Sequence, residues 1–192
     1  MKLLVAGDSF AAEWPGTNGW VKQLAEEHDV TNIAQAGVSE YKILKQVQSQ
    51  KLEDFDAVIV SHTSPSRVHI KKHPLHKQGL HKDCDLIYTD IAGRSSFFNK
   101  ELRTAQNYFK HIYDDQYYQD IYLILREKIN SIITIPYLSI SHLEIAKYYI
   151  VEDKHLDFSE FWDNHKGTEN HYNDIGNATV LKIILDNLNK IM

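Results

Sequence analysis

The chain has 192 residues, of which 43% are hydrophobic and 24% charged, and this composition excludes a disordered or fibrous protein. Its 26 acidic and 21 basic residues are mixed along the chain and give a net charge of −5, so no nucleic-acid partner is expected. The length suits one domain over residues 1–192.

We expect neither a membrane-spanning segment nor an export signal in this sequence. No stretch of the sequence approaches the ~20 apolar residues that cross a bilayer, and the apolar run at the N-terminus is too short for an export signal, so no membrane association is expected. The single cysteine, Cys84, has no partner for an internal disulfide. These features favour a cytoplasmic location.

The first third of the chain alternates short apolar runs with helical patterns. Residues 3–6, 30–34 and 57–60 are brief apolar runs that predict buried strands. Between them, apolar residues recur at helical spacing in 20–25 and 39–50. This order predicts an α/β fold: a three-layer α/β/α sandwich around a mostly parallel sheet of about five strands, with right-handed crossovers.

In the rest of the chain the alternation of strands and helices is first interrupted and then resumes. Residues 62–95 are rich in His and Lys, lack periodicity and predict an insertion or lid. Residues 96–130 have the apolar spacing of a helix, which Asp114 and Asp115 divide in two. We predict a fourth strand at Ile132–Ile135, ended by Pro136, and a short fifth at 147–151, before a C-terminal helix that opens near Asn173.

The residues that follow the first strand carry the first functional signal. Gly7-Asp8-Ser9-Phe10 stands where open parallel sheets bind ligands, at the carboxyl end of a strand. A serine there can point into the crevice while backbone N–H groups face a developing oxyanion. The same residues are also typical of a plain helix cap. The sequence lacks the glycines of a dinucleotide-binding turn, and Ala11 replaces the last glycine of an α/β-hydrolase elbow.

The tetrapeptide resembles the first conserved block of the GDSL/SGNH hydrolases, which starts at the N-terminal strand. Residues 32–37, Asn-Ile-Ala-Gln-Ala-Gly, are similar to the second block of that family. The resemblance implies a flavodoxin-like SGNH hydrolase fold, with Ser9 as the nucleophile. It also implies that the N–H groups of Ser9 and Gly37 form part of the oxyanion hole.

The third block of the family, G-x-N-D, is altered in this chain. Residues 61–67 here are Ser-His-Thr-Ser-Pro-Ser-Arg. Counting from the end of the strand places Ser64 at the position of the family's oxyanion asparagine, and Thr63 takes that position if the register shifts by one. Arg67 either binds an anionic group nearby or forms a surface salt bridge.

The last block supplies the base. His171 precedes the final helix, as the catalytic histidine of the family does, but Thr168 stands where the family has aspartate. Glu169, Asp163 or a backbone carbonyl is left to orient the imidazole. Asp8, Thr63 and Glu169 are the candidates for supporting roles.

The resemblance implies a serine esterase or acyl hydrolase that acts through a Ser–His dyad or triad. The expected substrate is a small-molecule or carbohydrate ester, such as an O-acetyl group on a sugar, and the reaction needs no metal or organic cofactor. The alternative is a non-catalytic module that binds a carbohydrate or another ligand on the same fold.

A second pattern lies in the insertion. Imidazole and thiolate are common zinc ligands. The insertion contains two pairs of such side chains, each with the spacing of a metal site, and the pairs follow one another closely. Three lysines in the same stretch oppose a cation, and the other interpretation is a lid over the crevice. The residues in question are His73, His76, His81 and Cys84.

Overall fold

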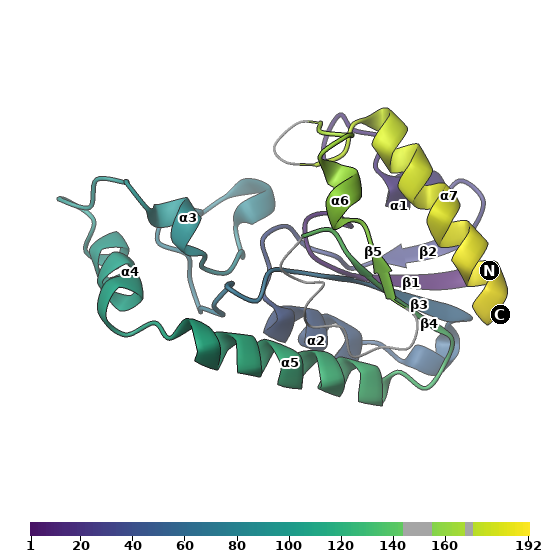
Figure 1. The fold of residues 1–192 in the computed structure, drawn as a ribbon, viewed down its shortest axis with the longest axis horizontal. Helices are drawn as coiled ribbons and strands as arrows, with labels where there is room; N and C mark the ends of the chain where they lie inside the picture. Colours follow the sequence, from purple (N-terminus) through teal and green to yellow (C-terminus); the bar gives the residue numbers. More distant parts are fainter. Residues whose placement is uncertain (144–154, 168–170) are drawn as a thin grey trace.

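A computed structural model describes residues 1–143, 155–167 and 171–192 of the chain. Its centre is a five-stranded parallel sheet in the order β2-β1-β3-β4-β5 (Figure 1). The strands are β1 (Lys2–Gly7), β2 (Asp29–Asn32), β3 (Ala57–His62), β4 (Tyr137–Ser141) and β5 (His155–Asp157). The predicted α/β sandwich is therefore confirmed.

Helices cover both faces of the sheet. Figure 1 shows α1 (Trp20–Leu24) and α7 (Asp174–Ile191) on one face and α2 (Glu40–Gln48) and α5 (Asp115–Ile132) on the other. From Leu3 to Gly7, β1 is buried on both faces of the sheet. Successive side chains of a strand point to opposite sides, so its residues pack in two different clusters. Leu3 and Val5 pack in the cluster with α1 and α7, whereas Leu4 and Ala6 pack in the cluster with α2 and α5.

Residues 63–114 form an extension between β3 and α5. It contains two short helices, η2 (Gly79–His81) and α3 (Tyr88–Ile91), and the longer α4 (Lys100–His111). Leu86, Ile91 and Leu102 give this extension a small buried cluster of its own. In Figure 1 the extension projects from the sheet, with α4 at its far side. The remaining helices are η1 (Leu52–Asp54) and α6 (Ser159–Trp162).

Side-chain caps fix the starts of the three longest helices. The Oδ1 atoms of Asn99, Asp114 and Asn173 accept hydrogen bonds from backbone N–H groups three residues further along, at 2.9, 3.2 and 2.8 Å. The predicted division at Asp114 and the predicted start of the last helix near Asn173 are thus confirmed. No helix in the described part of the chain is both long and apolar enough to span a bilayer.

The prediction of the fourth strand was wrong. Ile132 is the last residue of α5, and the strand begins after Pro136, at Tyr137. The isoleucines at 132, 133 and 135 pack on the cluster beside α2, so they bury their side chains without pairing in the sheet. The predicted strand at 147–151 lies outside the described residues, and the described fifth strand is 155–157.

Candidate active site

A cavity of about 610 Å³ opens at the carboxyl ends of the strands. Ser9 follows β1, Gly37 lies beyond β2, Thr63 follows β3, and His171 precedes α7, and all four line the cavity. The extension supplies the opposite wall with Arg67, His76, His81, Cys84 and Asp90. The fold therefore brings most of the predicted site residues, from distant parts of the sequence, to one place.

The turn that carries Ser9 depends on close contact between β1 and β3. A Cβ on Gly7 would lie 2.4 Å from the carbonyl oxygen of Ser61, so no larger residue fits. The Asp8 N–H donates to that same oxygen at 3.1 Å, and the Asp8 carbonyl accepts from the N–H groups of Ala11 and Ala12. The N–H of Ser9, inside this turn, donates to no described residue.

Gly37 is held by its carbonyl rather than by its N–H. Its φ of 71° lies in the left-handed region that favours glycine. The Gly37 oxygen accepts from the Asp85 N–H at 2.7 Å and from Arg67 Nη1 at 3.1 Å. The Gly37 N–H makes no hydrogen bond within the described residues. Two backbone donors, those of Ser9 and Gly37, thus remain available at the cavity.

The two hydroxyl candidates of the third block are separated by the structure. Thr63 lines the cavity with Ser9. Ser64 lines a different depression, beside Tyr88, and its Oγ accepts from the Ser66 N–H at 3.3 Å. The structure therefore places Thr63 at the candidate site and Ser64 outside it.

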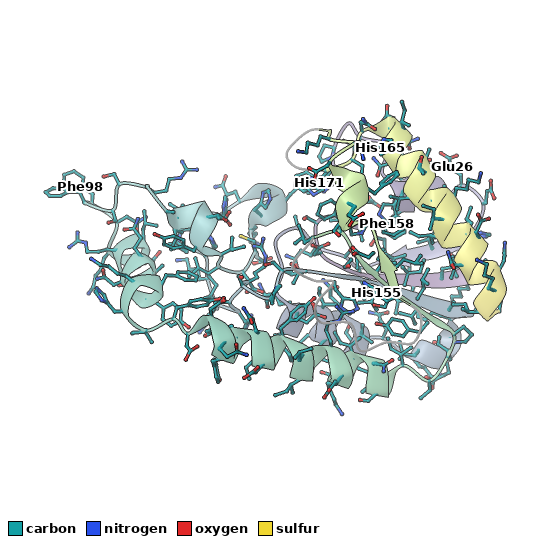
Figure 2. The ribbon with its side chains drawn as sticks, in the orientation of Figure 1. Glu26, Phe98, His155, Phe158, His165 and His171 are labelled. Carbon is teal, nitrogen blue, oxygen red and sulfur yellow. The ribbon has the colours of Figure 1, made fainter. Side chains whose placement is uncertain are left out.

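His171 lies between two aromatic rings. Its ring centroid is 4.3 Å from that of Trp14 and 5.0 Å from that of Phe10. The Trp14 indole Nε1 donates to the Ser9 carbonyl at 2.8 Å, so one side chain contacts both the serine and the histidine. The hydroxyl of Ser9 makes no hydrogen bond to a described residue, His171 included. Figure 2 shows His171 beside α6, far from Phe98 at the tip of the extension.

Of the residues proposed to orient His171, Glu169 lies outside the described residues, as does Thr168, which stands at the position of the family's aspartate. Asp163 is described, and its exposed carboxylate pairs with Lys166 at 2.9 Å. Neither observation assigns the third member of a triad.

Asp8 is buried beneath the turn. Its Oδ1 accepts from the Phe10 N–H at 3.1 Å and from the Ser61 hydroxyl at 3.0 Å. Burial raises the pKa of the Asp8 carboxyl to about 7, because the charged form loses hydration and these hydrogen bonds offset only part of that cost. Asp8 thus supports the turn that presents Ser9.

No motif in the sequence marks Trp14 or His142 as a site residue. His142 stacks on the Phe10 ring at 4.5 Å and accepts or donates at Nδ1 with the Tyr172 hydroxyl at 2.8 Å. Burial lowers the pKa of His142 to about 3, so its ring is neutral. A tryptophan five residues after the serine, outside any periodic segment, was the available signal for Trp14.

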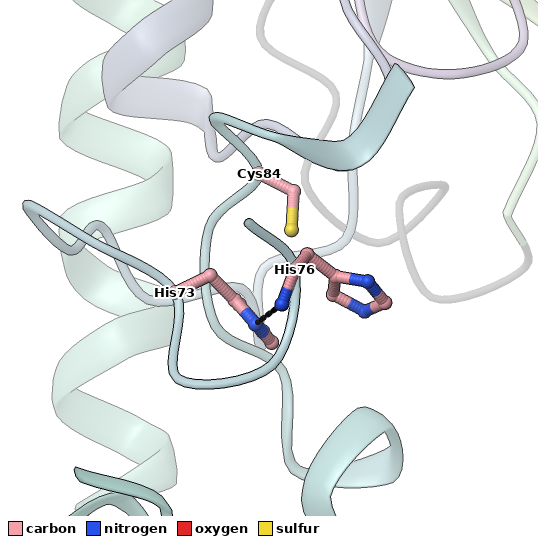
Figure 3. Close-up of side chains that lie close together, drawn as sticks. All are labelled: His73, His76 and Cys84. Carbon is pink, nitrogen blue, oxygen red and sulfur yellow. Dashed lines mark hydrogen bonds between the residues drawn. The ribbon is translucent and has the colours of Figure 1, made fainter. Parts of the chain in front are cut away.

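The predicted metal ligands are only partly brought together. Ligand atoms of His73, His76 and Cys84 lie within 4.8 Å of one another (Figure 3). His81 packs its ring 5.2 Å from that of His76 without joining this group. Burial lowers the pKa of His73 to about 4 and raises that of Cys84 to about 11, so the imidazole and the thiol are both neutral.

The hydrogen bonds of His73 affect how this cluster could bind a metal ion. Its Nδ1 accepts from the N–H groups of Leu75 and His76, at 3.2 and 3.1 Å, which leaves the ring proton on Nε2. A cation at Nε2 would require that proton to move to Nδ1 and both backbone hydrogen bonds to break. The residues therefore fit a metal only after rearrangement.

No family model matches the chain, and no curated protein sequence matches it. The function of the cavity is therefore inferred from its own residues.

Proposed function

We propose that the protein is a serine ester hydrolase in which Ser9 is the nucleophile and His171 the base. The observation that supports this most strongly is the meeting of Ser9, Gly37, Thr63 and His171 at one cavity, although they come from four separate segments. The motif around Ser9 and its resemblance to the GDSL/SGNH hydrolases add to it. The volume of about 610 Å³ suits a small ester, such as an O-acetylated sugar.

In the proposed reaction, Ser9 Oγ attacks the ester carbonyl carbon as His171 takes the hydroxyl proton. The imidazolium then protonates the leaving alcohol as the C–O bond breaks. Water, deprotonated by His171, releases the acid from Ser9 in the second half. Each step uses only groups of this chain, the substrate and one water molecule, and the Ser9 hydroxyl recovers its proton from His171 as the acid leaves.

The free backbone donors support the same reaction. Donors that already point at the developing negative charge stabilise the transition state without reorganisation. The N–H groups of Ser9 and Gly37 are the candidates for this role, because both residues line the cavity and neither N–H makes a hydrogen bond within the described residues. Thr63 lines the same cavity, and its hydroxyl is the third donor in the proposal.

One observation favours the alternative, a ligand-binding module without hydrolysis: the Ser9 hydroxyl is not hydrogen-bonded to His171. Catalytic hydrogen bonds are often long or absent in unliganded enzymes and form when substrate binds. The proposal therefore requires the Ser9 side chain to reach His171 in the substrate complex.

The test is covalent labelling with a fluorophosphonate together with hydrolysis of para-nitrophenyl acetate. We expect Ser9→Ala to abolish labelling and to lower kcat by about a thousandfold or more, and His171→Ala to slow both reactions. Ser64→Ala is the matched control, because Ser64 lies outside the cavity, and it should retain both activities. If wild-type protein labels and hydrolyses no faster than Ser9→Ala, the hydrolase proposal is rejected.

A further inference from the structure

We propose that Arg67 is an anion-binding residue of this cavity and that the substrate is an ester carrying a carboxylate or phosphate group close to its acyl carbonyl. The ester part of this inference rests on the proposed function. The anion-binding part depends only on Arg67 and its surroundings, and it can be tested without turnover.

Backbone carbonyls fix the Arg67 guanidinium in place. Its Nη1 donates to the Gly37 oxygen at 3.1 Å and to the Asp85 backbone oxygen at 3.2 Å. Both acceptors are uncharged, so they hold the plane of the guanidinium without neutralising its charge. A rigid guanidinium binds an anion with less loss of side-chain entropy than a mobile one.

The other edge of the guanidinium has unused donors. Nε is buried and makes no hydrogen bond, and Nη2 makes none to a described residue either. Nε and Nη2 together form one of the two-donor edges that match the spacing of carboxylate and phosphate oxygens. A buried N–H without an acceptor is unfavourable, and an anionic oxygen at this edge would remove that cost.

Arg67 is not paired with a carboxylate in the described part of the chain, where it forms no ion pair within 4.0 Å. The Asp85 carboxylate has other partners: the N–H groups of Ser39 and Ile70 and the side chains of Lys42 and His69. The surface salt bridge that the sequence left open for Arg67 is thus not formed.

The positive charge of Arg67 acts on the titratable groups around it. After burial, the charge on Arg67 contributes to lowering the pKa values of Asp8 and Cys84, whereas at His73 and His76 the opposing charge of Asp90 has the larger effect. Three of these residues, Asp8, His76 and Cys84, line the cavity. Because Asp8 and Asp90 also line this cavity, an anion is favoured at the unpaired donors of Arg67 rather than by the net charge of the wall.

The position of Arg67 sets where the anionic group would lie. A Cβ on Gly37 would stand 3.5 Å from Arg67 Nη1, so the guanidinium adjoins the residue proposed to bind the oxyanion. A substrate whose carbonyl sits at the N–H groups of Ser9 and Gly37 would therefore bring a neighbouring charged group to Arg67.

The first test compares matched esters. Acetoxyacetate and 2-acetoxyethyl phosphate carry the charge within a few bonds of the ester, and methyl acetoxyacetate is the neutral partner. We expect wild-type kcat/KM to be at least about tenfold higher for a charged ester, and the larger of the two values identifies carboxylate or phosphate as the group recognised. Arg67→Met should abolish this preference, Arg67→Lys should retain part of it, and Arg94→Met, on the exposed surface of the same extension, should leave it intact.

The second test measures binding alone, by calorimetric titration of Ser9→Ala protein with succinate and with inorganic phosphate. Saturable binding of either anion that is lost in Ser9→Ala/Arg67→Met and kept in Ser9→Ala/Arg94→Met supports the inference. If neither anion binds and wild type shows no preference for charged esters, the inference is overturned while the hydrolase proposal stands. Binding without any fluorophosphonate labelling of wild type would support the anion site and reject the hydrolase. Because Arg67 also contacts Gly37, a melting curve of each variant accompanies both tests.

Discussion

Gly37 and Cys84 are in such close contact that a Cβ built on Gly37 would lie 2.7 Å from the Cβ of Cys84. The contact joins the loop after β2 to the extension. It leaves room for glycine alone at the position whose N–H is proposed to bind the oxyanion.

Gly37→Ala should therefore both destabilise the protein and slow ester hydrolysis. Gly79→Ala is the matched control, because Gly79 has nearly the same φ, 70° against 71°, but open space around its Cβ position. The control measures the backbone cost alone, on the order of 1 kcal/mol. We expect Gly37→Ala to lose more unfolding free energy than that in urea titrations; equal losses would contradict the close contact.

Trp14 is expected to position both Ser9 and His171. Trp14→Leu removes the ring that packs on His171 and the hydrogen bond to the Ser9 carbonyl, and should lower kcat about tenfold or more with a smaller change in KM. Trp14→Phe keeps a ring without the donor and should lie between Trp14→Leu and wild type. A role in stability alone would lower the melting temperature and leave the pH–rate profile unchanged, whereas lost orientation of His171 should shift that profile.

The buried Asp8 carboxyl should make stability depend on pH. Its pKa is raised to about 7, so the folded protein binds this proton more tightly than the unfolded chain does, and stability falls as pH rises from about 4 to about 7. Asp8→Asn keeps an oxygen acceptor for Phe10 and Ser61 but has no charge to bury. We expect its unfolding free energy, relative to wild type, to rise across this window.

The control for that series is Asp186→Asn, on the exposed side of α7. It should follow the wild-type curve throughout. Equal pH dependence in Asp8→Asn and wild type would show that the pKa of Asp8 is the same in the folded and unfolded protein, contrary to the effect of its burial.

Cys84 should react slowly despite lying at the cavity wall. Burial raises its pKa to about 11, and only the thiolate attacks disulfide reagents. At about pH 8 we expect the thiol in the folded protein to react with Ellman's reagent on the order of a hundredfold more slowly than the same thiol after denaturation in guanidinium. Comparable rates in the two states would mean that the thiol is more exposed or more acidic than its surroundings indicate.

The elements that the sequence predicted well are those whose burial is visible in local pattern. β1 and the first four residues of β3 are short apolar runs, and both strands are buried on each face. β4 gave no such signal because it carries Ser139 and Ser141. Their hydroxyls are bonded to the buried Arg126 and to His155, partners that come from α5 and β5. Such pairing depends on tertiary contacts, which the local pattern does not reveal. The apolar isoleucines before Pro136 therefore matched the pattern of a buried strand better than β4 did.

The residues of the candidate site also divide into those that local sequence pattern indicates and those that depend on tertiary contacts. Ser9, Gly37 and His171 could be selected because each stands at a fixed place relative to a strand or to the last helix. The choice between Thr63 and Ser64 depended on where β3 ends, and the strand continues through the polar Ser61 and His62. His62 is buried there because its Nδ1 is bonded to Glu40 at 2.6 Å, a contact with α2 that no local pattern indicates.

The separate cluster of Leu86, Ile91 and Leu102 has a consequence for ligand affinity. Segments that bury few apolar side chains open locally at a lower free energy than the whole fold. Arg67 belongs to such a segment, whereas Ser9 and Gly37 lie on loops that directly follow strands β1 and β2 of the sheet. A ligand that contacts both would stabilise the extension against the sheet. Every substitution that destabilises the extension should therefore raise the dissociation constant of that ligand while the sheet stays folded.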